Sequence, residues 1–328
     1  MNETNNHYQI VVIGSGPAGF TAAIYSARGG AGTALLGGVA PGGQLLQTTE
    51  IENYPGFIEP VNGADLMERM LKQAKRLGTE VFTEDAASVD LSVRPFLVTT
   101  IFGRKYTADA LIAATGARAK WIGLPSEQKF IGKGVSGCAT CDGFFYRGRE
   151  VCVIGGGDTA VEDAQFLTKF ADKVYVVHRR DKLRANARLQ DKVRNNPKVE
   201  IIYDTILEEV LGAAKAEAAR IKNVKTGETR VLPTPGVFIA IGHDPATEIF
   251  RGQLNLDDSS YIVTDGRARA SVYGVFAAGD VTDPFYKQAV VAAGSGCKAA
   301  MEALKYLEEI KYPKINRPKD PLNRDYRP

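Results

Sequence analysis

The chain has 328 residues, of which 44% are hydrophobic and 24% are charged, and its formal net charge is +3. This length predicts about two domains, and the nearly neutral balance gives no support for the concentrated basic face of a nucleic-acid binder. The N-terminus, MNETNNHYQ, lacks the charged and apolar segments of a secretory signal, and four cysteines are too few for the disulfide framework of a small secreted domain. We therefore expect a protein of the reducing cytoplasm.

The first expected elements are a buried strand over residues 9–13, the turn GSGPAG, and a helix that begins at Pro17. The spacing G-x-G-x-x-G in this turn is formed by Gly14, Gly16 and Gly19. Between a strand and a helix, this spacing is a dinucleotide-binding fingerprint, because the glycines allow a tight turn and close approach of a pyrophosphate to the helix N-terminus. The apolar run over 10–27 is not expected to span a membrane, since the same glycines and the proline interrupt it.

One part of the fingerprint is missing. An acidic residue about 20 positions further on normally holds the ribose. Here the second strand, over 33–36, runs into Gly37 and Gly38. The first fingerprint therefore needs support from elsewhere in the chain.

A second copy follows in the sequence REVCVIGGGDTAVEDAQFLTKFADKVYVVHRR. We expect a strand over 150–154, a turn at Gly155–Gly157, a helix over 159–170 and a strand over 173–177, with Ala160 at the third fingerprint position. Two dinucleotide sites imply two nucleotides. The commonest use of such a pair is the passage of a hydride between a nicotinamide and a flavin.

Basic residues follow the second strand of this copy, where an NAD site would have Asp or Glu. They are His178, Arg179, Arg180 and Arg184. Guanidinium groups bind a 2′-phosphate through bidentate, charge-assisted hydrogen bonds, whereas a carboxylate would repel it. The second site is therefore predicted to select NADPH over NADH, the alternative being a solvated basic loop without a ligand.

The order of elements predicts that one domain is inserted into the other. The segments over 110–125 and 236–247 both look like apolar strands that end in a glycine before a proline-containing turn. A further strand is expected to end at Asp280, followed by a helix from about Gln288 to Leu307. We predict one domain made of residues 1–117 and 246–328 and an inserted domain over 118–245. The polar, proline-rich end of the chain is expected to be a surface tail.

Cys138 and Cys141 form a C-x-x-C with Asp142 directly after it. A structural zinc site needs four Cys or His ligands. The remaining cysteines, Cys152 and Cys297, fall in an apolar strand and in a helix, so we expect no metal and interpret these two as core residues. A redox couple fits better, because a dithiol gives up two electrons through a thiolate of lowered pKa.

Eight motifs in order resemble the low-molecular-weight thioredoxin reductases over essentially the whole chain apart from its last fifteen or so residues. They are GSGPAG, GGQL, ENYPG, CATCDG, GGGDTA, HRRDKLRA, AIGHDP and GVFAAGDV. The resemblance implies an α/β protein with two Rossmann-like, three-layer dinucleotide-binding domains, the NADPH domain being inserted into the FAD domain. It also implies a homodimer, without membrane or nucleic-acid partners, that uses FAD and NADPH to reduce thioredoxin.

The resemblance also implies which residues bind the cofactors. Those for FAD would be Gly14, Gly16, Pro17, Ala18, Gly19, Gly43, Gln44, Leu45, Thr48, Asn53, Ala114, Thr115, Gly116, Gly279, Asp280, Lys287, Gln288 and Ala289. Those for NADPH would be Gly155, Gly157, Asp158, Thr159, Ala160, His178, Arg179, Arg180, Arg184, Ile241 and Gly242. The chain departs from the family at Lys287, where arginine is frequent, and at Leu183, where phenylalanine is frequent.

By the same resemblance, Cys141 is the sulfur next to the flavin and Cys138 is the thiol that attacks the disulfide of thioredoxin. Asp142 would supply and take up the proton, which requires burial to raise its pKa; the alternative is a turn aspartate before Gly143. The crossings near Ala117 and His243 would be hinges between two arrangements of the domains. A second hypothesis keeps the same FAD-dependent disulfide reductase but takes electrons from ferredoxin or another flavin.

Overall fold

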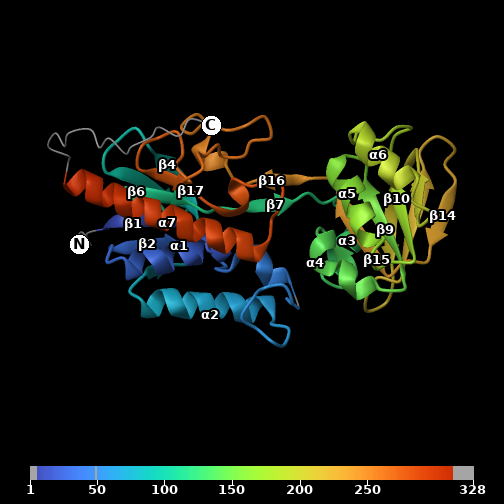
Figure 1. Ribbon diagram of the computed structural model, residues 1–328, viewed down its shortest axis with the longest axis horizontal. Helices are drawn as coiled ribbons and strands as arrows, with labels where there is room; N and C mark the ends of the chain where they lie inside the picture. The colour runs from blue at the N-terminus through green and yellow to red at the C-terminus, as the bar shows by residue number, and fades with distance from the viewer. Residues whose placement is uncertain (1–5, 49, 313–328) are drawn as a thin grey trace, which may run out of the picture. The chain divides into compact units, whose positions relative to one another are not determined.

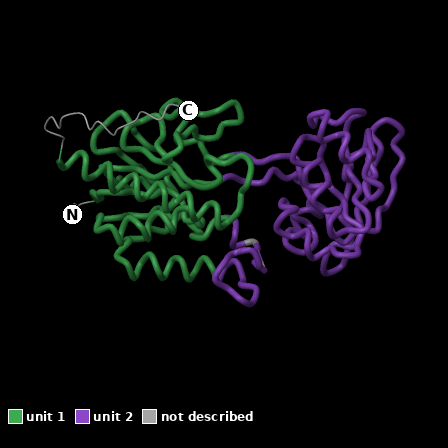
Figure 2. The backbone as a smooth tube through the Cα atoms, in the orientation of Figure 1, with its two compact units in different colours: residues 1–43, 66–116, 245–328 green, residues 44–65, 117–244 purple. Residues whose placement is uncertain are grey.

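The computed structural model describes residues 6–48 and 50–312. The chain divides into two compact units, which Figure 2 distinguishes by colour. Unit 1 comprises the described parts of 1–43, 66–116 and 245–328, and unit 2 those of 44–65 and 117–244. The sequence of unit 1 is thus interrupted by that of unit 2, while the exact boundaries after residues 117 and 245 stay predictions.

Unit 1 is built on a seven-stranded sheet in which β6 pairs with three neighbours. Its strands are β1 (His7–Ile13), β2 (Thr33–Leu36), β3 (Glu80–Phe82), β4 (Ala86–Asp90), β5 (Phe96–Thr100), β6 (Lys105–Ala113) and β17 (Val275–Ala277). The order β3-β2-β1-β6 is parallel, and β17 continues it along residues 111–113 of β6. The first half of β6 instead pairs antiparallel with β5. The sheet therefore combines parallel strands with the antiparallel strands β5 and β4.

Two helices lie together against this sheet (Figure 1). They are α1 (Pro17–Arg28) and α7 (Ala289–Lys311), and α2 (Gly63–Arg76) is the third long helix of the chain. A Cβ atom at Gly296 of α7 would lie 2.1 Å from the carbonyl oxygen of Ala18, so only glycine permits this close approach. On the opposite face of the sheet, a hydrophobic cluster without residues of α1 or α7 joins Phe96 of β5 to Phe250 and Ile262. The segments that contain Phe250 and Ile262 form the third layer.

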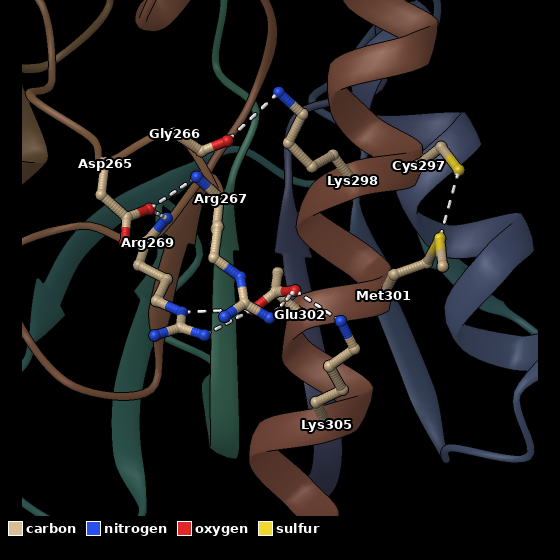
Figure 3. Close-up of polar contacts among 9 residues, drawn as sticks. All are labelled: Asp265, Gly266, Arg267, Arg269, Cys297, Lys298, Met301, Glu302 and Lys305. Carbon is tan, nitrogen blue, oxygen red and sulfur yellow. Dashed lines mark hydrogen bonds and ion pairs between the residues drawn. The ribbon is translucent and has the colours of Figure 1, made fainter. Parts of the chain in front are cut away.

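A buried carboxylate fixes α7 to the loop that precedes β17 (Figure 3). Glu302 is 6% exposed, and its Oε1 accepts hydrogen bonds from Arg267 (3.0 Å) and Lys305 (2.8 Å). Its Oε2 accepts one from Nη2 of Arg269 at 2.8 Å. Burial alone would raise the pKa of Glu302, but the hydrogen bonds from the three cations outweigh it and lower the pKa to about 2.

The free energy of unfolding should therefore depend on Glu302. Because its pKa in the folded protein is about 2, against 4.5 for a free side chain, its contribution is complete above about pH 4.5 and is lost as the pH falls towards 2. Glu302→Gln should cost up to about 3 kcal/mol at neutral pH and flatten the fall in stability on acidification. Urea unfolding at several pH values measures both. Glu308→Gln, an exposed neighbour on the same helix, is the control; an equal loss there would refute the assignment.

Unit 2 contains a five-stranded parallel sheet, a three-stranded antiparallel sheet and four short helices. The parallel strands are β8 (Val135–Ser136), β9 (Glu150–Gly155), β10 (Lys173–Val177), β11 (Val199–Ile202) and β15 (Gly236–Ala240), in the order β11-β10-β9-β15-β8. The antiparallel strands are β12 (Thr205–Leu211), β13 (Ala218–Asn223) and β14 (Thr229–Leu232). The helices are α3 (Pro125–Phe130), α4 (Ala139–Asp142), α5 (Asp158–Leu167) and α6 (Ala187–Arg194).

Successive side chains of β9 point to opposite faces of the parallel sheet in unit 2. Val151 and Val153 pack with residues of α5, whereas Cys152 and Ile154 pack with β12, β13 and β14 on the other face. Cys152 is fully buried, and burial raises the pKa of its thiol, so it is an inert core residue. Both units thus have the Rossmann-like α/β arrangement that the sequence predicts.

Two short strands lie where the chain passes between the units. β7 (Ala117–Ala119) and β16 (His243–Pro245) form a two-stranded sheet, and Lys120 makes a 2.8 Å ion pair with Asp244. Within the described residues, no helix combines the length and the hydropathy needed to cross a membrane. The tail expected at the C-terminus lies outside the described residues beyond Tyr312.

Three predicted ends differ from the structure. α5 ends at Leu167 rather than residue 170, because Thr168–Phe170 turn back so that Arg149 and Asp172 can bond. β17 ends at Ala277 and not at Asp280, since Gly279 has φ +78° and residues 279–281 form a 3-10 turn. α7 extends four residues beyond the predicted end at Leu307.

Candidate functional site

The first glycine turn connects β1 to α1. Gly14 has φ +110°, and a Cβ there would lie 2.1 Å from the carbonyl oxygen of Ala114 at the end of β6. A Cβ at Gly19 would lie 1.9 Å from the carbonyl oxygen of Gly14, whereas a Cβ at Gly16 would meet nothing within 4 Å. No side chain caps the helix that starts at Pro17. The outer two glycines are thus fixed by packing, and the middle one leaves open space in front of helix N–H groups.

The second glycine turn, between β9 and α5, repeats this arrangement. Gly155 has φ +157°, and its Cβ would lie 2.3 Å from the carbonyl oxygen of Ala240 at the end of β15. A Cβ at Gly157 would meet nothing within 4 Å, and no side chain caps the helix that starts at Asp158. Thr159 and Ala160 form its first turn, with Ala160 fully buried against Gly155. Both turns therefore fit the pyrophosphate of a dinucleotide.

Several other predicted FAD residues lie beside the first turn in unit 1. Ala114 contacts Gly14, a Cβ at Gly279 would lie 2.8 Å from the side chain of Ala18, and a Cβ at Gly43 would lie 3.3 Å from Gly16. Thr115 and Gly116 follow Ala114. Lys287, with φ +44°, and the N-cap Gln288 directly precede α7, which begins at Ala289. Burial raises the pKa of Asp280, next to Gly279, to about 6, although the charge of Lys287 lowers it.

The remaining predicted FAD residues belong to unit 2. Gln44 and Leu45 lie in a 3-10 turn over Gly43–Gln47, and the N–H of Thr48 donates to the carbonyl oxygen of Leu45 at 3.0 Å. The side-chain amide of Gln44 donates to the carbonyl oxygen of Ala117 at the start of β7. Asn53 lies between Ile51 and Val61, which form an isolated bridge. These four residues therefore belong to a different unit from the first glycine turn.

The predicted NADPH residues lie around the second turn. Arg179, Arg180 and Arg184 are exposed on the loop after β10. That loop is tied to the turn, because the carbonyl oxygen of Gly156 accepts from the N–H groups of Arg184 (2.6 Å) and Ala185 (3.2 Å). Ile241 and Gly242 follow β15, whose last residue contacts Gly155. The structure therefore brings the arginines, the glycines and the end of β15 to one edge of the parallel sheet.

Cys138 and Cys141 form a disulfide with their Cα atoms 5.3 Å apart. Cys138 is the N-cap of α4, and its Sγ accepts the N–H of Cys141 at 3.2 Å. The hydroxyl of Ser136 lies 3.0 Å from the N–H of Cys138, which donates to it. Cys138 is half-buried and Cys141 is exposed.

Asp142 follows the disulfide and is partly buried. Burial raises its pKa, and a hydrogen bond with Ser136 opposes this effect only in part. Burial also raises the pKa of Tyr146 to about 12, with a smaller contribution from the charge of Asp142. The condition that the sequence set for a proton-carrying aspartate, a raised pKa, is therefore present next to the cysteines.

The chain is similar to known proteins over most of its length. The family described as pyridine nucleotide-disulphide oxidoreductase matches residues 8–296. A thioredoxin reductase of Rickettsia conorii is 53% identical over 305 residues, covering 92% of this chain and 98% of that protein. Solved structures of thioredoxin reductases from Giardia duodenalis (45% identity, 92% of this chain and 99% of the other) and Streptococcus pyogenes (39%, 93% and 100%) both superpose with a TM-score of 0.89.

The chain belongs to the thioredoxin reductase family. This confirms the resemblance and the fold class that the sequence indicates, and with them the use of FAD and NADPH. The two glycine turns lie one in each unit of the chain.

Two residues within these turns, Ser15 and Gly156, were not among the predicted cofactor-binding residues. Ser15 donates from its hydroxyl to the carbonyl oxygen of Gly37 at 2.5 Å and accepts from the N–H of Gly42 at 3.0 Å. Gly156 packs against the ring of His178. Both stand at the variable middle position of a fingerprint, so the motif itself gives no signal for them.

Proposed function

We propose that this chain reduces thioredoxin with NADPH through a thiol-disulfide couple formed by Cys138 and Cys141. FAD, when bound, accepts a hydride from NADPH and supplies two electrons to a disulfide. The observation that carries the proposal is the Cys138–Cys141 disulfide at the start of α4, in the same unit as the second glycine turn. Membership of the thioredoxin reductase family supports it.

In this proposal, the first turn with the predicted FAD residues of unit 1 holds the flavin nucleotide, and the second turn holds NADPH. Gln44, Leu45, Thr48 and Asn53 of unit 2 complete the FAD set. The N–H groups at the starts of α1 and α5 face open space at Gly16 and Gly157, which supports pyrophosphate binding at both. Arg179, Arg180 and Arg184 bind the 2′-phosphate through charge-assisted hydrogen bonds.

Exchange with thioredoxin then follows from the sulfur geometry. The Cys138 thiolate attacks one sulfur of the thioredoxin disulfide, that S–S bond breaks, and a mixed disulfide forms while the leaving sulfur takes the electron pair. The Cys141 thiolate next attacks the sulfur of Cys138, which restores the Cys138–Cys141 bond and releases dithiol thioredoxin. Asp142 holds or releases the proton of these sulfurs, since burial raises its pKa.

The hypothesis of ferredoxin or another flavin as electron donor is less well supported. Such an enzyme has no use for a second dinucleotide turn or for a cluster of arginines after β10. Both are complete in this chain, and the relatives at high identity are thioredoxin reductases. NADPH is therefore the donor that we propose.

Exposed aromatic rings next to the disulfide support thioredoxin as the protein substrate. Phe144 and Phe145 lie in the 3-10 turn after α4, are 50% and 45% exposed, and have ring centroids 6.2 Å apart. Arg147 lies over the ring of Phe144 at 5.3 Å. Exposed aromatic and arginine side chains are typical of protein-binding hot spots. We assign the docking of thioredoxin to this surface.

Phe144→Ala and Phe145→Ala should each raise the KM for thioredoxin about tenfold and leave reduction of the bound flavin by NADPH unchanged. The reason is that, of the two substrates, the rings would contact thioredoxin and not NADPH. Steady-state assays with varied thioredoxin, together with stopped-flow reduction by NADPH, measure the two steps separately. Phe102→Ala removes a ring of similar exposure (66%) from unit 1 and should change neither value. An unchanged KM in both unit 2 variants would exclude this surface.

We also propose that the protein is a homodimer. Val290 and Met301 on α7 and Tyr25 on the neighbouring α1 are 41%, 48% and 39% exposed. Apolar side chains gathered on adjacent helices support a second copy as partner. Light scattering that gives the mass of one chain would contradict this. We place the protein in the cytoplasm, where thiol couples stay reduced; its recovery from another cell fraction would argue otherwise.

The direct test is anaerobic addition of NADPH to the purified flavoprotein. The flavin absorbance should bleach with NADPH and hardly with NADH, and added thioredoxin should be reduced. A flavin that bleaches with reduced ferredoxin but not with NADPH would replace this proposal by the alternative.

A further inference from the structure

The residue between the first two glycine positions of each fingerprint faces the loop after the strand that follows the fingerprint helix, β2 in unit 1 and β10 in unit 2. In unit 1 this residue is Ser15, whose hydroxyl reaches the carbonyl oxygen of Gly37 at the end of β2. In unit 1 the turn therefore contributes the side chain, that of Ser15, and the loop residue that it contacts, Gly37, has none.

Unit 2 uses the reverse arrangement. The turn has Gly156 without a side chain, and the loop after β10 begins with His178, whose ring occupies the space. A Cβ built on Gly156 would lie 2.2 Å from Nδ1 of His178 and 2.4 Å from its Cε1. Such a distance is a collision with a ring that is only 5% exposed. Gly156 and His178 are therefore complementary in size.

The ring of His178 is also held by the loop that it begins. Its Nε2 lies 2.9 Å from the carbonyl oxygen of Lys182. A carbonyl oxygen only accepts hydrogen bonds, so Nε2 carries the proton and donates it. The bond closes the loop over residues 178–182, which contains Arg179 and Arg180, and the bonds from Arg184 and Ala185 to Gly156 close its far end.

Burial and these contacts leave the ring no freedom to turn towards a cofactor. To turn towards a ligand, the imidazole would have to leave Gly156 and lose its partly buried hydrogen bond to Lys182. The three arginine side chains on the same loop, in contrast, are exposed. Their positions depend on where the loop backbone lies.

We propose that His178, packed on Gly156 and bonded to Lys182, is a positioning residue that places the arginine loop for the 2′-phosphate of NADPH and does not itself contact the cofactor. The inference rests on the proposed function of that loop as the 2′-phosphate site. The sequence predicts that His178 binds NADPH directly. We infer instead that it favours NADPH over NADH by holding the arginine loop in place.

His178→Ala should raise the KM for NADPH about tenfold, with little change in kcat or in the KM for NADH, because only the 2′-phosphate contacts lose their placement. Binding of adenosine 2′,5′-bisphosphate, measured by calorimetry, should weaken by the same factor, while binding of 5′-AMP should not. His178→Gln, which keeps an N–H donor at similar reach, should recover most of the loss. Equal losses for both nucleotides would reduce His178 to a purely structural role and overturn the proposal.

A double-variant cycle tests the contact with Gly156. Gly156→Ala alone should weaken bisphosphate binding, because the new methyl group collides with the ring. In the His178→Ala background the same change should add almost nothing, since the ring is gone. Additive effects would refute the pairing. If Arg179→Ala and Arg180→Ala also leave bisphosphate binding unchanged, the proposed 2′-phosphate site is wrong; if they weaken it and the His178 variants do not, only this inference fails.

Discussion

Cys138→Ser should lose thioredoxin reduction by about a thousandfold or more and still show bleaching of its flavin by NADPH. A serine hydroxyl is a poor nucleophile toward a disulfide and cannot form the mixed disulfide. The cofactor turns at Gly14 and Gly155 do not involve this side chain, so hydride transfer should continue. Stopped-flow absorbance under argon and a coupled thioredoxin assay measure the two half-reactions.

Matched serine variants of the other sulfurs distinguish the two roles within the couple. Cys297→Ser changes a partly exposed thiol of α7 outside the couple and should keep full activity. Cys141→Ser should also stop turnover, but it leaves Cys138 as a free thiol able to form a trapped mixed disulfide with thioredoxin, visible on non-reducing gels. Trapping by Cys138→Ser in place of Cys141→Ser would exchange the two assignments.

Removing the arginines after β10 should change cofactor choice. Arg179→Ala and Arg180→Ala should each raise the KM for NADPH by about tenfold to a hundredfold, the value of one charge-assisted hydrogen bond, and leave the KM for NADH nearly unchanged. The combined variant should approach equal use of the two nucleotides. Both side chains are exposed, so the fold should not suffer.

The control for this series is Arg194→Ala, which removes a guanidinium from the last turn of α6, where it bonds to Gln190. It lowers the net charge of unit 2 equally and should not alter the ratio of the two KM values. If it changes the ratio as much as Arg180→Ala, general electrostatic attraction of NADPH explains the preference and specific phosphate contacts do not.

The local elements of this fold could be predicted because their signals are local. Strand, glycine turn and helix follow each other within about 20 residues at both fingerprints, and the structure confirms β1, α1, β9 and β10 close to their predicted bounds. The antiparallel sheet β12-β13-β14 and the ribbon β4-β5 were not predicted. These strands carry no glycine fingerprint beside them, and strand propensity depends strongly on the cross-strand neighbours that the sequence alone does not show.

The site was predictable to the same degree. Its motifs located the disulfide and both turns, but no motif showed that Ser15 bonds to Gly37 or that Gly156 receives a ring from a loop 22 residues away. The role of His178 as an NADPH ligand stays a prediction, and the positioning role that we propose instead rests on its packing against Gly156. Side chains that act through tertiary contacts show no regular spacing in the sequence, so only the structure reveals them.

The disulfide joins residues only three positions apart, within a single turn of chain. A cross-link stabilises a fold chiefly by restricting the unfolded chain, and the restriction grows with the length of the segment that it encloses. The Cys138–Cys141 disulfide encloses only the two residues between its cysteines. The protein can therefore break and remake the bond in every catalytic cycle with a smaller change in stability than the opening of a long disulfide loop would cause.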